Sequence, residues 1–310
     1  MGILRGLHVP MGWLQILKKV GVSLYEDNLL GWAAELAYFS FLALFPALLF
    51  FVALAGYFPV HDLTSSVVNA LAGFAPSDVI DIVKTQLTQI ARRPHTGLLT
   101  LGIIGAIWSA SSGMSSAIST LDQVYRVRDR RSWWHVRATA IGLTVTLAVF
   151  IIISFALVLA GPPLADKIAH AAGLGPLFSW TWKIAQWPVI FALVSFGVAI
   201  VYYVAPDVAQ DWIWLTPGSI FATLLWLAVS LGFRWYVVEF ANYQATYGAI
   251  GGVIVALTWL YVSALAVLMG AKMNATIEHA SPMGKDPGEH AVGDRERGFA
   301  EPVLPQRKSA

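Results

Sequence analysis

A face of small and hydroxyl-bearing residues runs through the apolar stretch 97–121 and is the first candidate for chemistry in this sequence. Its members follow one another at steps of three and four residues, so in a helix they lie on one side. They are Gly102, Gly105, Ser109, Ser112, Ser116 and Ser119. Such residues serve close packing between helices. The alternative is a polar path, in which Ser109, Ser112, Ser116 and Ser119 contact a substrate.

The residues needed for hydrolysis or metal binding are absent or scattered. The chain has no cysteine, and its seven histidines include no pair four residues apart. No group of Asp, Glu and His has the spacing of a metal site, and the sequence lacks the GxGxxG, GxSxG and HExxH patterns and a P-loop. We therefore expect no enzymatic activity, no metal, no cofactor and no nucleic-acid partner.

Glu35 and Pro46 are unusual in their surroundings, because the run 36–60 has no charged residue. At the start of a membrane helix, a carboxylate faces the positive end of the helix dipole. Alternatively, Glu35 points into a polar cavity between helices and binds a cation or a proton. Pro46 removes one helical hydrogen bond, so we expect a kink there, which neighbouring helices in a membrane protein make tolerable.

The composition indicates that these residues act in a membrane. The chain is 57% hydrophobic and 12% charged, whereas soluble domains are about 25% charged. Six uncharged runs have about the 20 residues that a helix needs to cross a bilayer. They are 36–60, 97–121, 138–161, 187–205, 214–233 and 248–271. The predicted fold class is all-α, a polytopic membrane helix bundle with six transmembrane helices.

The connections between these runs fix the predicted topology. Both termini are expected in the cytoplasm, because this places about fourteen Lys and Arg residues inside and six outside. Residues 1–30 form an amphipathic segment that lies on the membrane surface or packs as an ordinary helix. Residues 31–279 form the transmembrane domain, in which Pro162 and Pro163 end the third span and the outer loop 61–96 is helical. Residues 280–310 are expected to be a disordered cytoplasmic tail.

Arginines are concentrated in the loop that follows the second span. Clustered basic residues beside a span either anchor it on the cytoplasmic side or bind anionic lipid headgroups. The headgroup candidates are Arg126, Arg128, Arg130 and Arg131. Asp122 and Arg126 are four residues apart and would pair if the helix of the second span continued through them.

The last span repeats the theme of small residues. Gly248, Gly252 and Ala256 are four residues apart, and Gly251 adds room beside them. This spacing is typical of a close helix–helix contact, either within one chain or between two copies.

Five segments resemble the YihY/BrkB family of bacterial inner-membrane proteins. They cover most of residues 31–275 in the same order and read AAELAYFSFLALFPALLFFV, WSASSGMSSAISTLDQVY, VYYVAPD, TPGSIFATLLW and YGAIGGVIVALTWLYVSALAVLMGAKMNA. The resemblance implies a six-helix protein of the bacterial cytoplasmic (inner) membrane. The family pattern usually reads G-A-E-x-N near the end of the last span. Lys272 stands here in place of the acidic residue.

The resemblance also carries a ribonuclease BN label, which the scattered histidines do not support. Uncharged spans with a hydroxyl face instead favour transport or flipping of a lipid or another amphipathic substrate, with membrane lipids as partners. The alternative is a non-transporting scaffold for envelope assembly. Its expected partner is either a second copy of the chain or an envelope protein.

Overall fold

The computed structural model describes residues 12–55, 99–172, 175–208, 216–240 and 249–280, together with positions 68, 72, 77, 80–81 and 84–85. The described elements are all helices. They are α1 (Trp13–Glu26), α2 (Leu29–Ala55), α5 (Leu99–Val124), α6 (Trp133–Ala172), α7 (Gly175–Val204), α8 (Pro217–Phe240) and α10 (Ala249–Ala280). The all-α prediction is confirmed for this part of the chain.

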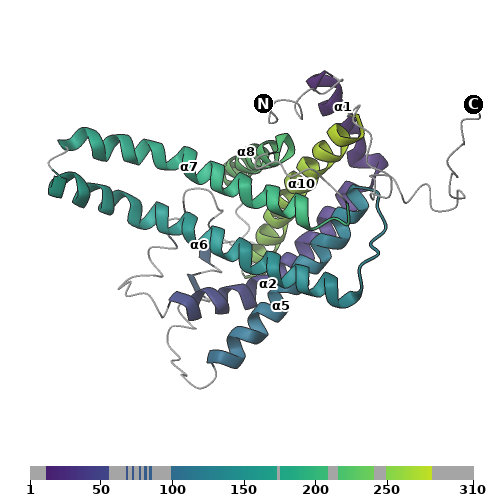
Figure 1. Ribbon diagram of the computed structural model, residues 1–310, viewed down its shortest axis with the longest axis horizontal. Helices are drawn as coiled ribbons and strands as arrows, with labels where there is room; N and C mark the ends of the chain where they lie inside the picture. The colour runs from purple at the N-terminus through teal and green to yellow at the C-terminus, as the bar shows by residue number, and fades with distance from the viewer. Residues whose placement is uncertain are drawn as a thin grey trace, which may run out of the picture.

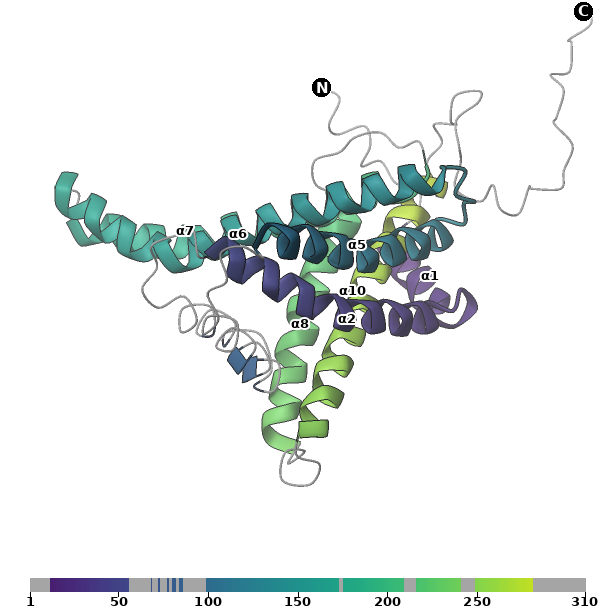
Figure 2. The ribbon, with the colours of Figure 1, turned by 90° about the horizontal axis from the view of Figure 1, so that it is seen from below.

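The long helices form three pairs, α2 with α5, α6 with α7, and α8 with α10. Figures 1 and 2 show that these pairs diverge from one common end of the molecule, with the α6–α7 pair and the α8–α10 pair pointing in different directions. We call this common end the base. It contains Asp27, residues 122–131, residues 205–208 and Lys272.

Four described segments are long and apolar enough to cross a membrane, namely Trp133–Val158, Leu177–Val204, Pro217–Val237 and Gly251–Glu278, and α2 contributes a shorter apolar segment, Leu29–Leu44. The number of six spans and the cytoplasmic position of the termini stay predictions. The helices extend beyond the uncharged runs on which the spans were predicted. The four segments include Arg137, Lys183, Arg234, Lys272 and Glu278.

The helix of the third predicted span does not end at Pro162 and Pro163, since α6 continues through both prolines to Ala172. The neighbouring helix α7 is close at this point. A Cβ atom built on Gly161 would lie 2.9 Å from Gln186 Oε1 and 3.2 Å from Trp182 Nε1. Proline is tolerated inside membrane helices where a neighbouring helix packs against it. Helix α7 begins at Gly175 rather than at the predicted residue 187, and its additional turns pack against the extended part of α6.

The first helix packs against the last one. Ile16 and Val20 of α1 are buried against Met273 of α10. Trp13 and Leu17 of the same helix are exposed. The packing alternative is confirmed for α1, and contact of its exposed face with the membrane surface stays a prediction.

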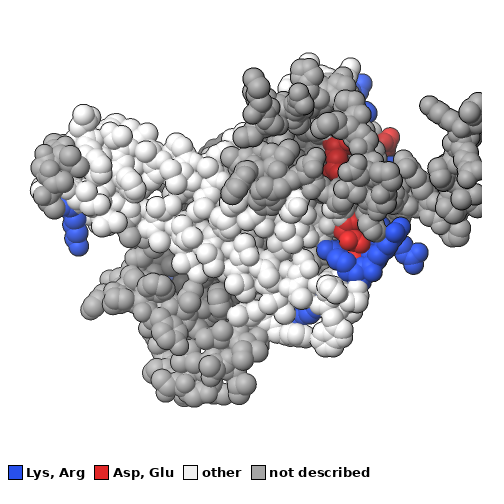
Figure 3. Space-filling view, in the orientation of Figure 1, with Lys and Arg blue, Asp and Glu red and all other residues white. Residues whose placement is uncertain are grey.

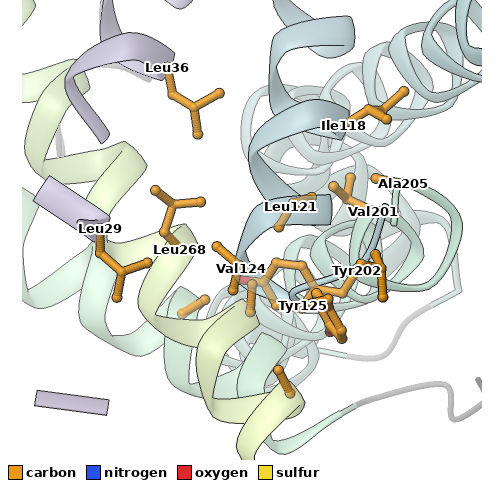
Figure 4. Packing of buried hydrophobic residues seen from close by; sticks show 14 of the residues in the cluster. Leu29, Leu36, Ile118, Leu121, Val124, Tyr125, Val201, Tyr202, Ala205 and Leu268 are labelled. Carbon is orange, nitrogen blue, oxygen red and sulfur yellow. The ribbon is translucent and has the colours of Figure 1, made fainter. Parts of the chain in front are cut away.

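A cluster of buried apolar side chains holds the helix pairs together next to the base. Figure 4 shows this cluster, in which α2, α5, α7 and α10 meet. Its largest members are Tyr125 and Tyr202, which are 0% and 1% exposed. The hydroxyl group of Tyr202 donates a hydrogen bond to the carbonyl oxygen of Val267 and so links α7 to α10. The cluster closes the bundle at the end that carries the charges.

Some predictions fall mainly outside the described residues. In the loop 61–96, the described positions Val68, Ser77, Ile80, Asp81, Lys84 and Thr85 are helical. The proposed tail beyond residue 280 and Gly248 lie outside. Helix α2 runs through Pro46, but its side chain and the expected kink are also outside the described part.

Candidate functional site: a central cavity above a charged base

A cavity of about 510 Å³ lies between the three helix pairs. Side chains from α2, α5, α6, α7, α8 and α10 all line it. The lining is mainly apolar, and its hydroxyl groups come from Ser40, Thr144 and Ser263. A volume of this size is typical of a pocket for a small organic molecule.

The described part of the chain closes the cavity toward the base and encloses it less farther along α6. Leu36 and Val201 line the cavity and also belong to the buried cluster next to the base. Val145 and Ile151, which lie farther along α6, line it as well but are 41% and 42% exposed.

The serine face predicted as a substrate path does not line this cavity. The cavity contacts α5 through Ile107, Ala110, Gly113, Met114 and Ala117. Ser109, Ser112 and Ser119 are exposed on other sides of α5, and Ser116 is 9% exposed. The path through these serines stays a prediction, but the described cavity gives it no support.

Glu35 and Ser116, both predicted as path residues, contact each other. The Ser116 hydroxyl donates to Glu35 Oε1 over 3.2 Å, across the α2–α5 interface. Glu35 is exposed and lines no part of the cavity. The structure therefore brings two candidates together on the outside of the bundle rather than inside it.

The four headgroup candidates in the α5–α6 connection fall into two groups. Arg128 and Arg130 are exposed. Arg126 and Arg131 form ion pairs with carboxylates of the protein itself. The expected pairing of Asp122 with Arg126 is wrong. Helix α5 ends at Val124 and Arg126 takes a left-handed backbone conformation (φ 56°), which turns its side chain toward Asp27.

On the face that Figure 3 shows, charged groups gather at the base, whereas α6 and α7 are uncharged along most of their length and carry a basic side chain near their far end. Arg131 lies among three carboxylates from different segments. Its guanidinium donates to both oxygens of Asp129 over 3.0 Å, and it lies 3.6 Å from Asp122 Oδ2 and 3.9 Å from Asp207 Oδ1. This cluster ties the α5–α6 connection to the end of α7.

Asp122 is the most buried of these carboxylates, at 4% exposed. Burial raises its pKa to about 7, although the backbone N–H of Asp207 donates to it and Arg131 is near. The pKa of Asp129 is lowered, because hydrogen bonds from Arg131 outweigh the effect of its burial. The guanidinium of Arg131 is therefore the positive charge that offsets the repulsion among the three carboxylates of this cluster.

Asp27 forms the second charged contact of the base. It lies 2.6 Å from Arg126 Nη2 and 2.8 Å from Lys272 Nζ. Burial alone would raise the pKa of this carboxyl, but hydrogen bonds from Lys272 and Arg126 lower it to about 2. Lys272, which stands where the family pattern has an acidic residue, thus joins the last helix to the connection between α1 and α2.

Replacing Asp27 with asparagine should lower stability by about 1–3 kcal/mol at pH 7, because two cations lose their counter-charge. The folded pKa of Asp27 lies below its unfolded value, so its contribution is present above about pH 4 and is lost as the pH falls toward 2. Melting temperatures in detergent at pH 7 and pH 3 measure this. The difference in melting temperature between wild type and D27N should be smaller at pH 3 than at pH 7. An equal difference at both pH values would rule out the ion pairs as its cause.

Sequence reasoning missed a close helix contact, which lies between α8 and α10 at Gly218 and Gly270. A Cβ atom on Gly218 would lie 2.2 Å from the carbonyl oxygen of Gly270. Asn274 of α10 completes the contact, since its side-chain oxygen accepts from Gly218 N over 2.8 Å and its amide donates to Thr216 Oγ1. Among the predicted packing residues, Gly251 and Ala256 are buried and Gly252 is partly buried.

Long apolar helices whose charged residues lie outside their apolar middle parts define a polytopic helical membrane protein. The chain belongs to the BrkB family, because the family described as virulence factor BrkB matches residues 22–294. This confirms the resemblance found in the sequence. No solved structure matches the chain.

Several bacterial relatives are similar over most of the chain. The ribonuclease-like protein YfkH of Bacillus subtilis is 36% identical over 79% of this chain and 88% of its own length. The UPF0761 membrane protein PSHAa0171 of Pseudoalteromonas translucida is 23% identical over 86% of each. The UPF0761 membrane protein RSc1559 of Ralstonia nicotianae is 26% identical over 81% of this chain, which spans 56% of that relative's length.

Proposed function

We propose that this membrane protein transports or flips a lipid or another amphipathic molecule across the bacterial cytoplasmic membrane, with both of its termini in the cytoplasm. The observation that carries the proposal is the cavity between the three helix pairs. Its apolar lining suits an acyl chain, and Ser40, Thr144 and Ser263 suit polar groups at the chain's head. The chain itself is proposed to need no cofactor and no catalytic group.

The closed base supports a transport mechanism with two alternating states. In the described state the cavity is closed by the buried cluster around Tyr125 and Tyr202, and the ion pairs of Asp27 and Arg131 lie next to it. A substrate that enters between the diverging helix pairs would reach the other side only if this layer opened. These ion pairs would have to separate in that step, and water entering the opened base would then solvate the separated charges.

Filling the cavity should block transport. Ala110 and Ala264 line it from α5 and α10, and the A110F and A264F variants should reduce lipid flipping by about tenfold or more, equivalent to about 1.4 kcal/mol on the barrier. The measurement uses proteoliposomes with headgroup-labelled lipids and an impermeant quencher. Ala228→Phe is the matched control, because Ala228 is exposed on α8 and lines no part of the cavity.

Melting temperature and size-exclusion profile establish that each variant is folded. Flipping by the wild type and A228F that is lost in A110F and A264F would support the proposal. Folded wild-type protein that flips no anionic, zwitterionic or neutral lipid above the level of empty vesicles would overturn it. The scaffold alternative would then predict co-purification of a second copy or of an envelope protein.

A further inference from the structure

Arg137 is a nearly buried cation that the cavity and the base do not use. It lies one turn into α6 and is 9% exposed. Its guanidinium donates to Ser112 Oγ over 3.2 Å and to the carbonyl oxygen of Trp108, and it lies 4.0 Å from the centre of the Trp108 ring. Among the described residues, no carboxylate lies within ion-pair distance of it, and its Nε atom has no hydrogen-bond partner.

This environment leaves a positive charge without a counter-ion in the described part of the chain. Hydroxyl, carbonyl and ring contacts orient a guanidinium, but they do not neutralise it. A charge that is removed from water is costly unless an opposite charge accompanies it. An arginine in a membrane helix therefore marks a functional site whose partner has to be identified.

Glu35 supplies the opposite charge at a distance, through the serine face of α5. Ser112 contacts Arg137, and Ser116, one helical turn farther along α5, donates to Glu35 Oε1 over 3.2 Å. A row of four polar residues thus crosses three helices, with a cation at one end and a carboxylate at the other. In order, these residues are Arg137, Ser112, Ser116 and Glu35. We call these four residues the polar row. Glu35 and Ser112 are exposed, so the row faces the outside of the bundle.

Tryptophans indicate the depth of the polar row in the membrane. Trp133 and Trp134, one turn before Arg137, are 59% and 71% exposed, and their rings are 4.5 Å apart. Exposed tryptophans favour the boundary between the acyl chains and the headgroups. Arg137 therefore lies close to headgroup depth, where phosphate groups are abundant.

We propose that the polar row binds the headgroup of an aminophospholipid, with the phosphate on Arg137 and the headgroup amine on Glu35. The planar guanidinium matches the geometry of a phosphate group, and its Nη1 atom, which donates to exposed Ser112, is on the side from which a headgroup can approach. The carboxylate of Glu35 accepts from an ammonium group, and the serine hydroxyls lie between the two. The inference does not depend on transport, since none of the four residues lines the cavity.

Binding of defined lipids to the purified full chain in detergent tests the site, with native mass spectrometry as the readout. The probes are phosphatidylethanolamine, phosphatidylglycerol and soluble phosphoethanolamine. R137Q should weaken binding of both lipids by about 10- to 100-fold, because charge-assisted hydrogen bonds to the phosphate are lost. E35Q should weaken the binding of phosphatidylethanolamine by about tenfold and leave the binding of phosphatidylglycerol unchanged, because only the amine of the headgroup contacts Glu35.

Lys183→Gln is the matched control, since it removes one positive charge from α7, where Lys183 pairs with exposed Asp166 over 3.5 Å. It should leave binding of both lipids unchanged. R137K keeps the charge and loses the fork geometry, so it should bind both lipids more weakly than the wild type does. It replaces R137Q in the comparison if R137Q does not fold. Equal lipid binding by wild type, R137Q and R137K would overturn the site. If E35Q kept the wild-type ratio of phosphatidylethanolamine to phosphatidylglycerol binding, the role of the amine would be overturned. If phosphoethanolamine bound as tightly as phosphatidylethanolamine, the ligand would be the free headgroup and not the lipid.

Discussion

Replacing Gly270 or Gly218 with alanine should leave little folded protein. A Cβ atom on Gly270 would lie 2.5 Å from both the Ala222 Cβ atom and the Gly218 carbonyl oxygen. On Gly218, the same atom would lie 2.2 Å from the Gly270 carbonyl oxygen and 2.4 Å from Asn274 Oδ1. Backbone atoms cannot move aside without separating α8 from α10, so we expect a loss of about 3 kcal/mol or more. The yield of monodisperse protein in detergent and its melting temperature measure the effect.

Gly232 offers the matched control on the same helix. Its Cβ position is open, with no atom within 4 Å, so G232A should be neutral or should stabilise the protein by about 0.5–1 kcal/mol through the higher helix propensity of alanine. If G218A and G270A melted at the same temperature as G232A, the contact between α8 and α10 would have to be looser than described. A loss restricted to the first two variants would assign the effect to the contact and not to glycine in general.

Helix positions could be predicted from the sequence, because long uncharged runs have few alternatives in a membrane. Their ends could not be predicted as well. Pro162 and Pro163 were predicted to end a helix, as they would in water, but the neighbouring α7 supports a continuous α6. The uncharged runs also marked only the apolar middle of each helix. The predicted third span, 138–161, therefore begins after Arg137, although Arg137 lies within α6.

The candidate site could be predicted only in its parts. The spacing of Ser112 and Ser116 correctly places them one turn apart on α5, and Glu35 was singled out for its carboxylate next to an apolar run. Their contacts across helices depend on tertiary packing, which spacing in one sequence does not encode. The central cavity was not predicted for a similar reason. Its lining consists of ordinary apolar residues, such as Leu36 and Ile107, whose importance comes from the divergence of the helix pairs.

Replacing Arg131 with glutamine should destabilise the base more than any other single change of charge. Three carboxylates would lose their common cation, and Asp122, at 4% exposed, is shielded from the solvent that could compensate for it. Removing one partner of a buried ion pair costs about 3–5 kcal/mol. Arg131 also donates to the carbonyl oxygen of Ala205 over 2.8 Å, so the end of α7 would lose a contact as well. Melting temperature in detergent measures the loss.

The pH dependence distinguishes lost charge neutralisation from lost packing in R131Q. Without Arg131, burial and mutual repulsion should hold the folded pKa of Asp122 even farther above its unfolded value than in the wild type, where it is already about 7. A group with a raised folded pKa favours the folded state below its unfolded pKa, and this advantage is lost as the pH rises through the folded pKa. R131Q should therefore be closest to wild type at pH 5 and farthest from it at pH 8.

Two further variants separate the cluster from general charge effects. Arg128→Gln removes an exposed arginine three positions away and should change stability by less than about 0.5 kcal/mol. Adding D122N to R131Q removes the most buried carboxylate together with its cation, so part of the lost stability should return, with a coupling energy of about 1–3 kcal/mol. If R131Q were as stable as R128Q at pH 8, the three carboxylates would have to be neutral or hydrated without Arg131, and the base would be closed by its apolar cluster alone.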